Sequence, residues 1–287
     1  SQHIQLLQCG VHAAELPGQG VRGVVAGVHE QPVQQLVDRV LAAGADAIVL
    51  DVKSGSGAFM GDIKEAKALA RAMVDLGREA GRETVAYITD MNQPLGRAVG
   101  NGLEVAEAVE ILSGMHGGGR LCRLSLELGA EMLALGGIAA DKAQGIAMMR
   151  EAISSGEGLR RFRAMVAEMG GDAGALEDPA ALYRTRHVRQ VHAVKSGWIS
   201  AMDVREMGRA AQMLGAGRET KEDVIDPAVG YVMLKELGDR VEAGEPVAQF
   251  YFNEEHRGVD AMDVFRAAVG IADAPQPTPP LVYEVIR

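Results

Sequence analysis

The sequence predicts an α/β domain followed by a smaller α+β domain. Residues 45–52, "ADAIVLDV", form a continuous apolar run, which is typical of a parallel strand covered on both faces. Residues 61–81 have the pattern of an amphipathic helix, and residues 82–91 read as the next strand. Strand, helix and strand in this order predict a βαβ unit with a parallel sheet.

The remaining elements are placed by turn residues and periodicity. The first 35 residues have no clear period, and the chain becomes helical toward 34–43. Asp62 has capping-box spacing to Glu65, and Gly81 is suited to ending the helix that they begin. Four helical stretches between 103 and 170 each end in or near glycine. Short alternating stretches follow, with helices expected near 203–213 and 259–272 and a final strand, "LVYEVI".

Three segments are therefore expected. They are an amino-terminal segment, 1–40, an α/β domain, 41–180, and a carboxyl-terminal α+β domain, 181–287. Because aromatic residues make up only 4% of the chain, we expect cores built from aliphatic side chains and Met.

Composition argues against nucleic acid and membrane partners. The net charge is −10, whereas nonspecific binding to phosphates needs an excess of Lys and Arg. No apolar run approaches the roughly 18 residues of a membrane span. Cys9 and Cys122 are far apart, and the start lacks a basic segment followed by an apolar one. A reducing, cytoplasmic location is expected.

A glycine-rich loop, Gly55-Ser56-Gly57, follows the first strand. Ligands of open α/β sheets bind at the carboxyl ends of strands, so backbone contact with a ligand is one interpretation. The alternative is a turn that needs glycine for steric reasons. The loop is neither a dinucleotide fingerprint, since Met60 stands at the third glycine position, nor a Walker loop.

A second loop, "TDMNQPLGRAVGNG", follows the next strand and has the composition of a binding loop or of a long connector. Two such loops on one sheet edge favour a shared site. Other candidates are weaker. The seven histidines include no convincing zinc pair, and Arg160, Arg161 and Arg163 have the spacing of a solvated helix face.

Several long motifs resemble the pyrimidine nucleoside phosphorylases, the family that contains thymidine phosphorylase. They are "AGADAIVLDVKSGSGAFM", "ITDMNQPLGRAVGNGLEVAEAVEIL", "LELGAEMLALGG", "LGAGRETKEDVIDPAVGYVMLKELGDRVEAGEPVA" and "PTPPLVYEVI". The resemblance covers about residues 41–287. It implies that phosphate attacks C1′ of a pyrimidine nucleoside, releasing the base and (deoxy)ribose 1-phosphate. No cofactor is implied; inorganic phosphate is a co-substrate, and the family forms dimers, so a homodimer is expected.

The resemblance also implies site residues. The loop of Lys53, Ser54, Phe59 and Met60 lines the nucleoside pocket, with Phe59 against the base. An ordinary core aromatic is the alternative for Phe59. Some members bind a monovalent cation, and Leu95, Ala98 and Glu107 stand at matching positions. The alternative for Glu107 is a surface helix residue.

The resemblance weakens toward the amino end. The family motifs K-H-S-T-G-G-x-G-D, which binds phosphate, and S-G-R-G-x-x-x-T-G-G-T-x-D do not occur in this sequence. Gln35 and Arg39 stand where the family has the Ser and Lys that hold the base. Residues 1–40 are interpreted as divergence, a foreign fusion or a frame-shifted reading. Arg39 keeps a positive charge, but its planar fork differs from an ammonium.

Three further interpretations stay open. An AMP phosphorylase-like enzyme shares the same motifs. A catalytically inactive family fragment fits the missing phosphate loop, and we expect little or no phosphorolysis by this chain alone. "LGDRVEAGEPVAQF" resembles the hairpin of biotinyl- and lipoyl-like domains, which implies a β hammerhead. A carrier function would need Lys235 at an exposed hairpin tip.

Overall fold

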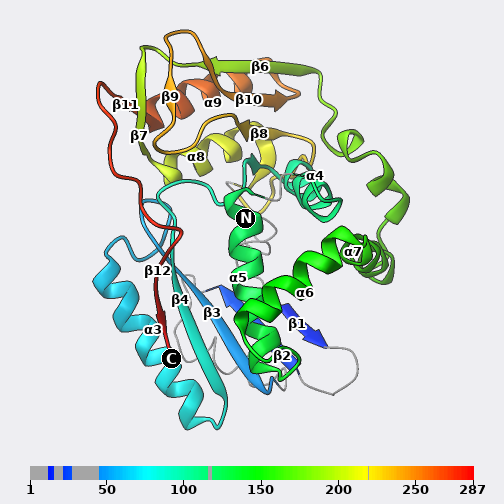
Figure 1. Ribbon diagram of the computed structural model, residues 1–287. Helices are drawn as coiled ribbons and strands as arrows, with labels where there is room; N and C mark the ends of the chain where they lie inside the picture. Colours follow the sequence, from blue (N-terminus) through cyan, green and yellow to red (C-terminus); the bar gives the residue numbers. More distant parts are fainter. Residues whose placement is uncertain (1–11, 16–21, 28–44, 116–117, 219) are drawn as a thin grey trace. The chain divides into compact units, whose positions relative to one another are not determined.

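A computed structural model describes residues 12–15, 22–27, 45–115, 118–218 and 220–287 (Figure 1). These residues form two compact units, and each unit is discontinuous in sequence. The α/β unit contains the described residues between His12 and Met91 together with 118–152 and 279–287. The α+β unit contains 92–115 and 153–278. Contiguous segments were expected, and the predicted boundaries near 40 and 180 stay predictions.

The α/β unit is built on a five-stranded sheet in the order β1-β2-β3-β4-β12. Its strands are β1 (His12–Glu15), β2 (Arg22–Gly27), β3 (Ala47–Ser54), β4 (Glu83–Asp90) and β12 (Val282–Ile286). β2, β3 and β4 are parallel, while β1 and β12 pair antiparallel at the edges. The predicted βαβ unit is confirmed. The two strands β1 and β2 were not predicted, because their segment shows no period.

The two central strands, β3 and β4, are buried along almost their whole length. In β3 all residues but one are buried, and in β4 all but the first. Helix α3 (Ile63–Glu79) covers part of the sheet with a small-residue face that includes Ala66, Ala70 and Met73. The Asp62 side chain accepts the Lys64 N–H at 2.8 Å, and Gly81 ends the helix with a φ of 72°. Both predicted helix boundaries are confirmed.

The carboxyl-terminal strand β12 belongs to the α/β unit, not to the second domain in which it was expected. It pairs antiparallel with β4, Val285 lying opposite Tyr87 (Figure 1). The Arg287 guanidinium binds both carboxylate oxygens of Glu131, at 2.7 and 3.0 Å. Glu131 also accepts the buried Tyr87 hydroxyl at 2.6 Å. An alternating strand can pair with any sheet edge, and these side-chain partners favour β4.

Helix α5 (Arg120–Leu135) lies in the α/β unit. Helix α6 (Lys142–Ser154) belongs to the same unit up to Ala152, and its last two residues belong to the α+β unit. The α+β unit holds the other helices and two sheets. Its helices are α4 (Asn101–Leu112), α7 (Glu157–Glu168), α8 (Val204–Ala211), which continues as a π-turn (Gln212–Ala216), and α9 (Glu255–Ala268), with short 3-10 turns at Ala173–Glu177 and Pro179–Tyr183.

The strands of the α+β unit form a four-stranded and a three-stranded sheet. The orders are β5 (Ala98–Val99), β8 (Gly230–Met233), β10 (Pro246–Phe252), β6 (His187–His192), and β11 (Val269–Ala272), β7 (Gly197–Met202), β9 (Arg240–Val241). The helix expected over 259–272 ends at Ala268, because the chain turns there into β11.

The α+β core departs from the aliphatic composition that was expected. Tyr231 stacks on Phe250 at 4.9 Å between ring centroids, and Phe265 meets both rings edge-on. All three side chains are fully buried. Three of the eleven aromatic residues of the chain thus pack together in this core, where each buries a large apolar area.

Helix α3 packs closely on β4 only because residue 77 is glycine. A Cβ added at Gly77 would overlap Thr84 Oγ1 and lie 2.9 Å from Thr84 Cβ. Gly77→Ala should lower the free energy of unfolding by about 1–3 kcal/mol in urea titrations, although Ala favours helices. Gly61→Ala is the matched control, since its Cβ meets nothing within 4 Å, and should change stability by less than about 0.5 kcal/mol. Equal losses would contradict this packing.

Candidate functional site

The glycine-rich loop after β3 is bound by its backbone to the end of β4. Met91 N–H donates to Ser54 O at 2.8 Å, and Gly57 N–H donates to Met91 O at 3.0 Å. Gly55 has a φ of 133°, a conformation that other residues rarely adopt, and its carbonyl accepts the Ala58 N–H at 3.0 Å. The steric need for glycine is therefore real, and it produces a loop of defined shape.

That loop displays one aromatic side chain. Phe59 is 61% exposed, whereas the preceding Ala58 is 1% exposed. The alternative of an ordinary core aromatic is therefore wrong for Phe59. Ser54 is buried and bridges to Met60, which packs partly against the core of the α/β unit. Among the residues of this loop predicted to line the pocket, Phe59 is the one whose side chain is largely exposed.

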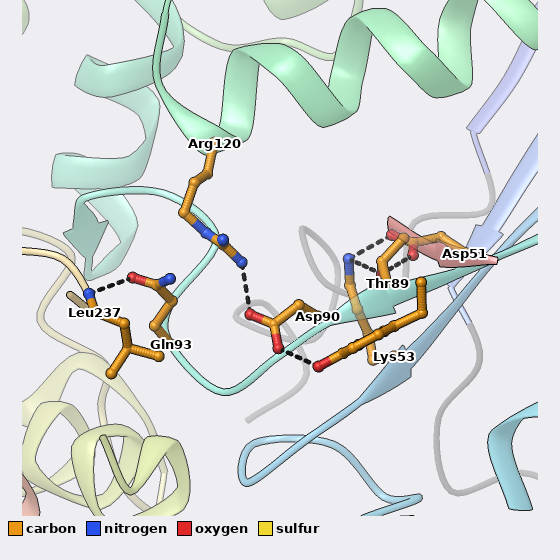
Figure 2. Close-up of polar contacts among 8 residues, drawn as sticks. Asp51, Lys53, Thr89, Asp90, Gln93, Arg120 and Leu237 are labelled. Carbon is orange, nitrogen blue, oxygen red and sulfur yellow. Dashed lines mark hydrogen bonds and ion pairs between the residues drawn. The ribbon is translucent and has the colours of Figure 1, made fainter. Parts of the chain in front are cut away.

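Lys53 belongs to a network of charged and polar side chains near the ends of β3 and β4 (Figure 2). Its ammonium lies 2.6 Å from the Asp51 carboxylate and donates to Thr89 Oγ1 at 3.0 Å. The Thr89 hydroxyl donates in turn to Asp51 at 2.5 Å. Asp51 and Thr89 are buried, and Lys53 is directly opposite Thr89 in the sheet. Lys53 thus joins the two strands at the base of the loop.

A second charged group lies one residue further along β4. Arg120, at the start of α5, donates to Asp90 at 2.8 Å, and the Tyr283 hydroxyl of β12 donates to the same carboxylate at 2.8 Å. Asp90 and Arg120 are both buried. Sequence reasoning missed this group. The only available signal was the acidic residue that ends the strand "ITD".

The second predicted loop, after β4, is held by Glu107 of α4. Glu107 accepts the Arg97 N–H at 2.8 Å and the Ala98 N–H at 3.0 Å. It is 8% exposed, so its interpretation as a surface helix residue is wrong. A Cβ at Gly96 would lie 2.5 Å from Glu107 Oε2, which explains the glycine there. This loop belongs to the α+β unit, so a site shared with the first loop stays a prediction.

Glu104 lies one helical turn before Glu107 and has an unusual pKa. Burial is the main cause, and together with the neighbouring Glu107 charge it raises the pKa of Glu104 to about 7, while the Gly100 N–H opposes the shift. That N–H donates to Glu104 at 3.1 Å. Two carboxylates of α4 therefore hold the backbone of residues 97–100.

The chain matches two family profiles. Residues 28–159 match the glycosyl transferase family a/b domain, and residues 198–272 match the pyrimidine nucleoside phosphorylase C-terminal domain. It is 41% identical over 268 residues to the pyrimidine-nucleoside phosphorylase of Geobacillus stearothermophilus and 42% identical over 271 residues to that of Staphylococcus aureus strain USA300. Each alignment covers 93% of this chain and 61% of the relative.

The chain belongs to the pyrimidine nucleoside phosphorylase family. It spans about three-fifths of the length of the curated relatives it matches. The two matched profiles fit the expected α/β and α+β parts, and the β hammerhead stays a prediction.

Other positions singled out in this phosphorylase-family chain have structural partners or lie outside the described residues. Arg160 and Arg161 pair with Glu157 on the exposed face of α7, as predicted. Lys235 is partly buried and bound to Glu245 at 2.5 Å, which argues against a displayed carrier lysine. Gln35 and Arg39 lie outside the described residues.

The described residues also limit what else the chain holds. They contain no helix that combines the length and hydropathy of a membrane span. Within the same residues, no three His, Cys, Asp or Glu side chains gather as a metal site would require.

The raised pKa of Glu104 predicts a pH-dependent stability. The pKa of Glu104 is about 7 in the fold, against an ordinary value of 4.5 for a glutamate side chain. As the pH rises, the unfolded chain therefore loses this proton before the folded chain does. The stabilisation is full below pH 4.5 and is lost as the pH rises to about 7. Glu104→Gln keeps an oxygen for the Gly100 N–H but carries no charge. It should match the wild type near pH 4.5 and exceed it by on the order of 2 kcal/mol at pH 8.

Urea unfolding from pH 4.5 to 8 measures this difference. A constant gap between Glu104→Gln and the wild type across that range would contradict the raised pKa.

Proposed function

We propose that the protein is a pyrimidine nucleoside phosphorylase whose base-contacting residue is Phe59. The exposure of Phe59 on a rigid glycine-rich loop is the observation that carries this proposal. A largely exposed aromatic ring on a fixed backbone offers a flat apolar surface to a nucleobase. The names of the two relatives favour pyrimidine nucleosides over the AMP alternative.

The proposed reaction is a transfer of the pentosyl group to phosphate. A phosphate oxygen forms a bond to C1′ while the bond from C1′ to the base nitrogen breaks, and the base leaves with the electron pair and then takes up a proton. Negative charge develops on the base and positive charge on the sugar, so the site must stabilise both. Among the residues of this chain, we propose that Phe59 orients the base and that Arg39, which lies outside the described residues, supplies positive charge.

The remaining residues of the loop have supporting roles in this proposal. Lys53, bound to Asp51 and Thr89, fixes the strand end from which the loop starts. Ser54 and Met60 close the loop through their bridge. We propose further that β8 to β10 form the biotinyl/lipoyl-like hammerhead, which the left-handed turns at Gly238 and Gly244 support. A homodimer and a cytoplasmic location stay predictions.

Ultraviolet assays of base release from uridine and thymidine, with and without phosphate, test the proposal on the chain of residues 1–287. The sequence alone predicted little or no phosphorolysis by this chain, whereas the names of the two relatives and the hydrogen-bonded Phe59 loop favour phosphate-dependent release, which we expect here. Phe59→Ala should raise KM about three- to tenfold because a stacking contact is lost. The same variant should change the free energy of unfolding by less than about 0.5 kcal/mol, since the ring is exposed. Met169→Ala, at another exposed side chain, is the matched control.

Two outcomes would overturn the proposal for this chain. One is the absence of phosphate-dependent release from a chain that unfolds cooperatively. The other is release with the same KM in Phe59→Ala and the wild type.

We also propose that Leu95, Ala98 and Glu107 contribute ligands to a monovalent cation. Backbone carbonyl groups and a carboxylate are oxygen donors, which suit such a cation. The Glu107 carboxylate fits this role because it is buried, and among the described residues no Lys or Arg lies within ion-pair distance of it. The hydrogen bonds that Glu107 accepts within the described part of the chain come from the backbone N–H groups of Arg97 and Ala98.

Thermal unfolding in KCl and in choline chloride of equal concentration tests the cation proposal. Potassium should raise the Tm by about 2 °C or more, because binding to the folded state alone stabilises it. Glu107→Gln should lose this difference, while Glu110→Gln, an outward residue of the same helix, should keep it. Equal Tm values for the wild type in both salts would contradict the proposal.

A further inference from the structure

Asp90 is the point at which three separate segments meet at the end of β4. Its carboxylate binds Arg120 of α5 and Tyr283 of β12, each at 2.8 Å. Its backbone N–H donates to Leu281 O at 3.0 Å, just before β12 begins. Figure 2 shows Arg120 reaching from α5 to the Asp90 carboxylate. Side chain and backbone together fix the position of this residue.

Met91, the residue after Asp90, connects Asp90 to the glycine-rich loop through backbone hydrogen bonds. Met91 uses both of its backbone groups there: its N–H donates to Ser54 at the start of the loop, and its carbonyl accepts from Gly57 in the middle. Phe59 follows Gly57 by two residues. A displacement of Asp90 would therefore move or release the backbone that presents the Phe59 ring.

The chemistry of this group is poorly explained by stability alone. The Asp90 and Arg120 side chains are almost fully buried, and pairing two buried charges is often no more favourable than packing apolar side chains.

We infer that Asp90, held by Arg120 and Tyr283, is a positioning residue that sets the Phe59 loop for the nucleoside base. This inference rests on the proposed function. The residue touches no reacting atom and acts through the Met91 backbone. The carboxyl-terminal strand β12 thereby takes part in substrate binding through Tyr283, although the loop and β12 are far apart in sequence.

Tyr283→Phe is the most selective test, since it removes the hydroxyl that binds Asp90 and keeps the ring. Tyr87→Phe is the matched control. It removes another tyrosine hydroxyl that donates to a buried carboxylate, Glu131, from the strand paired with β12. Both variants should lose similar global stability, so a difference between them reports on the loop.

The first readout is amide hydrogen exchange, which needs no activity. Exchange at Gly57 and Met91 should be about tenfold faster in Tyr283→Phe than in the wild type, and unchanged in Tyr87→Phe. The second readout is steady-state kinetics with uridine and phosphate. KM should rise about three- to tenfold in Tyr283→Phe with kcat within about twofold, because ground-state and transition-state binding are weakened alike.

The outcomes separate this inference from the proposed function. If the wild type releases no base but Gly57 exchange still responds selectively to Tyr283→Phe, the function fails and the control of the loop by Asp90 stands. If the wild type is active and Tyr283→Phe matches Tyr87→Phe in exchange and KM, the inference is overturned. Should Tyr283→Phe fail to fold, Arg120→Lys, which keeps the charge but not the guanidinium geometry, takes its place with the same expected shifts.

Discussion

Two buried carboxylates at the ends of neighbouring parallel strands impose the constraint on which the α/β unit depends. The Asp51 carboxylate is bound by Lys53 and Thr89. The Asp90 carboxylate is bound by Arg120 and Tyr283. A buried charge is tolerated only when charged or polar partners surround it. Satisfying both carboxylates therefore fixes β3 against β4, and fixes β4 against α5 and β12.

The functional consequence is a short loop with little freedom. Its glycine allows a tight backbone path, and the hydrogen bonds to Met91 hold that path against the end of β4. Phe59 then projects from a backbone that hydrogen bonds already order, so the proposed binding of a base would cost little conformational entropy. The arrangement places an apolar surface at the carboxyl edge of the sheet, where α/β proteins bind ligands.

Local sequence patterns predicted individual helices and strands, but they could not predict which distant segments pair with one another. The apolar run of β3, the cap at Asp62 and the stop at Gly81 are local signals, and each is confirmed. The partner of β12 and the bond between Arg120 and Asp90 join distant segments, for which one sequence holds no local signal. The exposure of Phe59 and the burial of Glu107 were left as alternatives, because spacing does not specify which face a side chain occupies.

Mapping of uridine binding by backbone amide chemical shifts, in the chain of residues 1–287, tests most directly whether the Phe59 loop contacts the base. We expect the largest shifts at about 1 mM uridine to fall on residues 54–60, and Phe59→Ala to weaken them. Shifts confined to other segments, or none in a cooperatively folded chain, would contradict the claim that this loop presents the base-contacting residue.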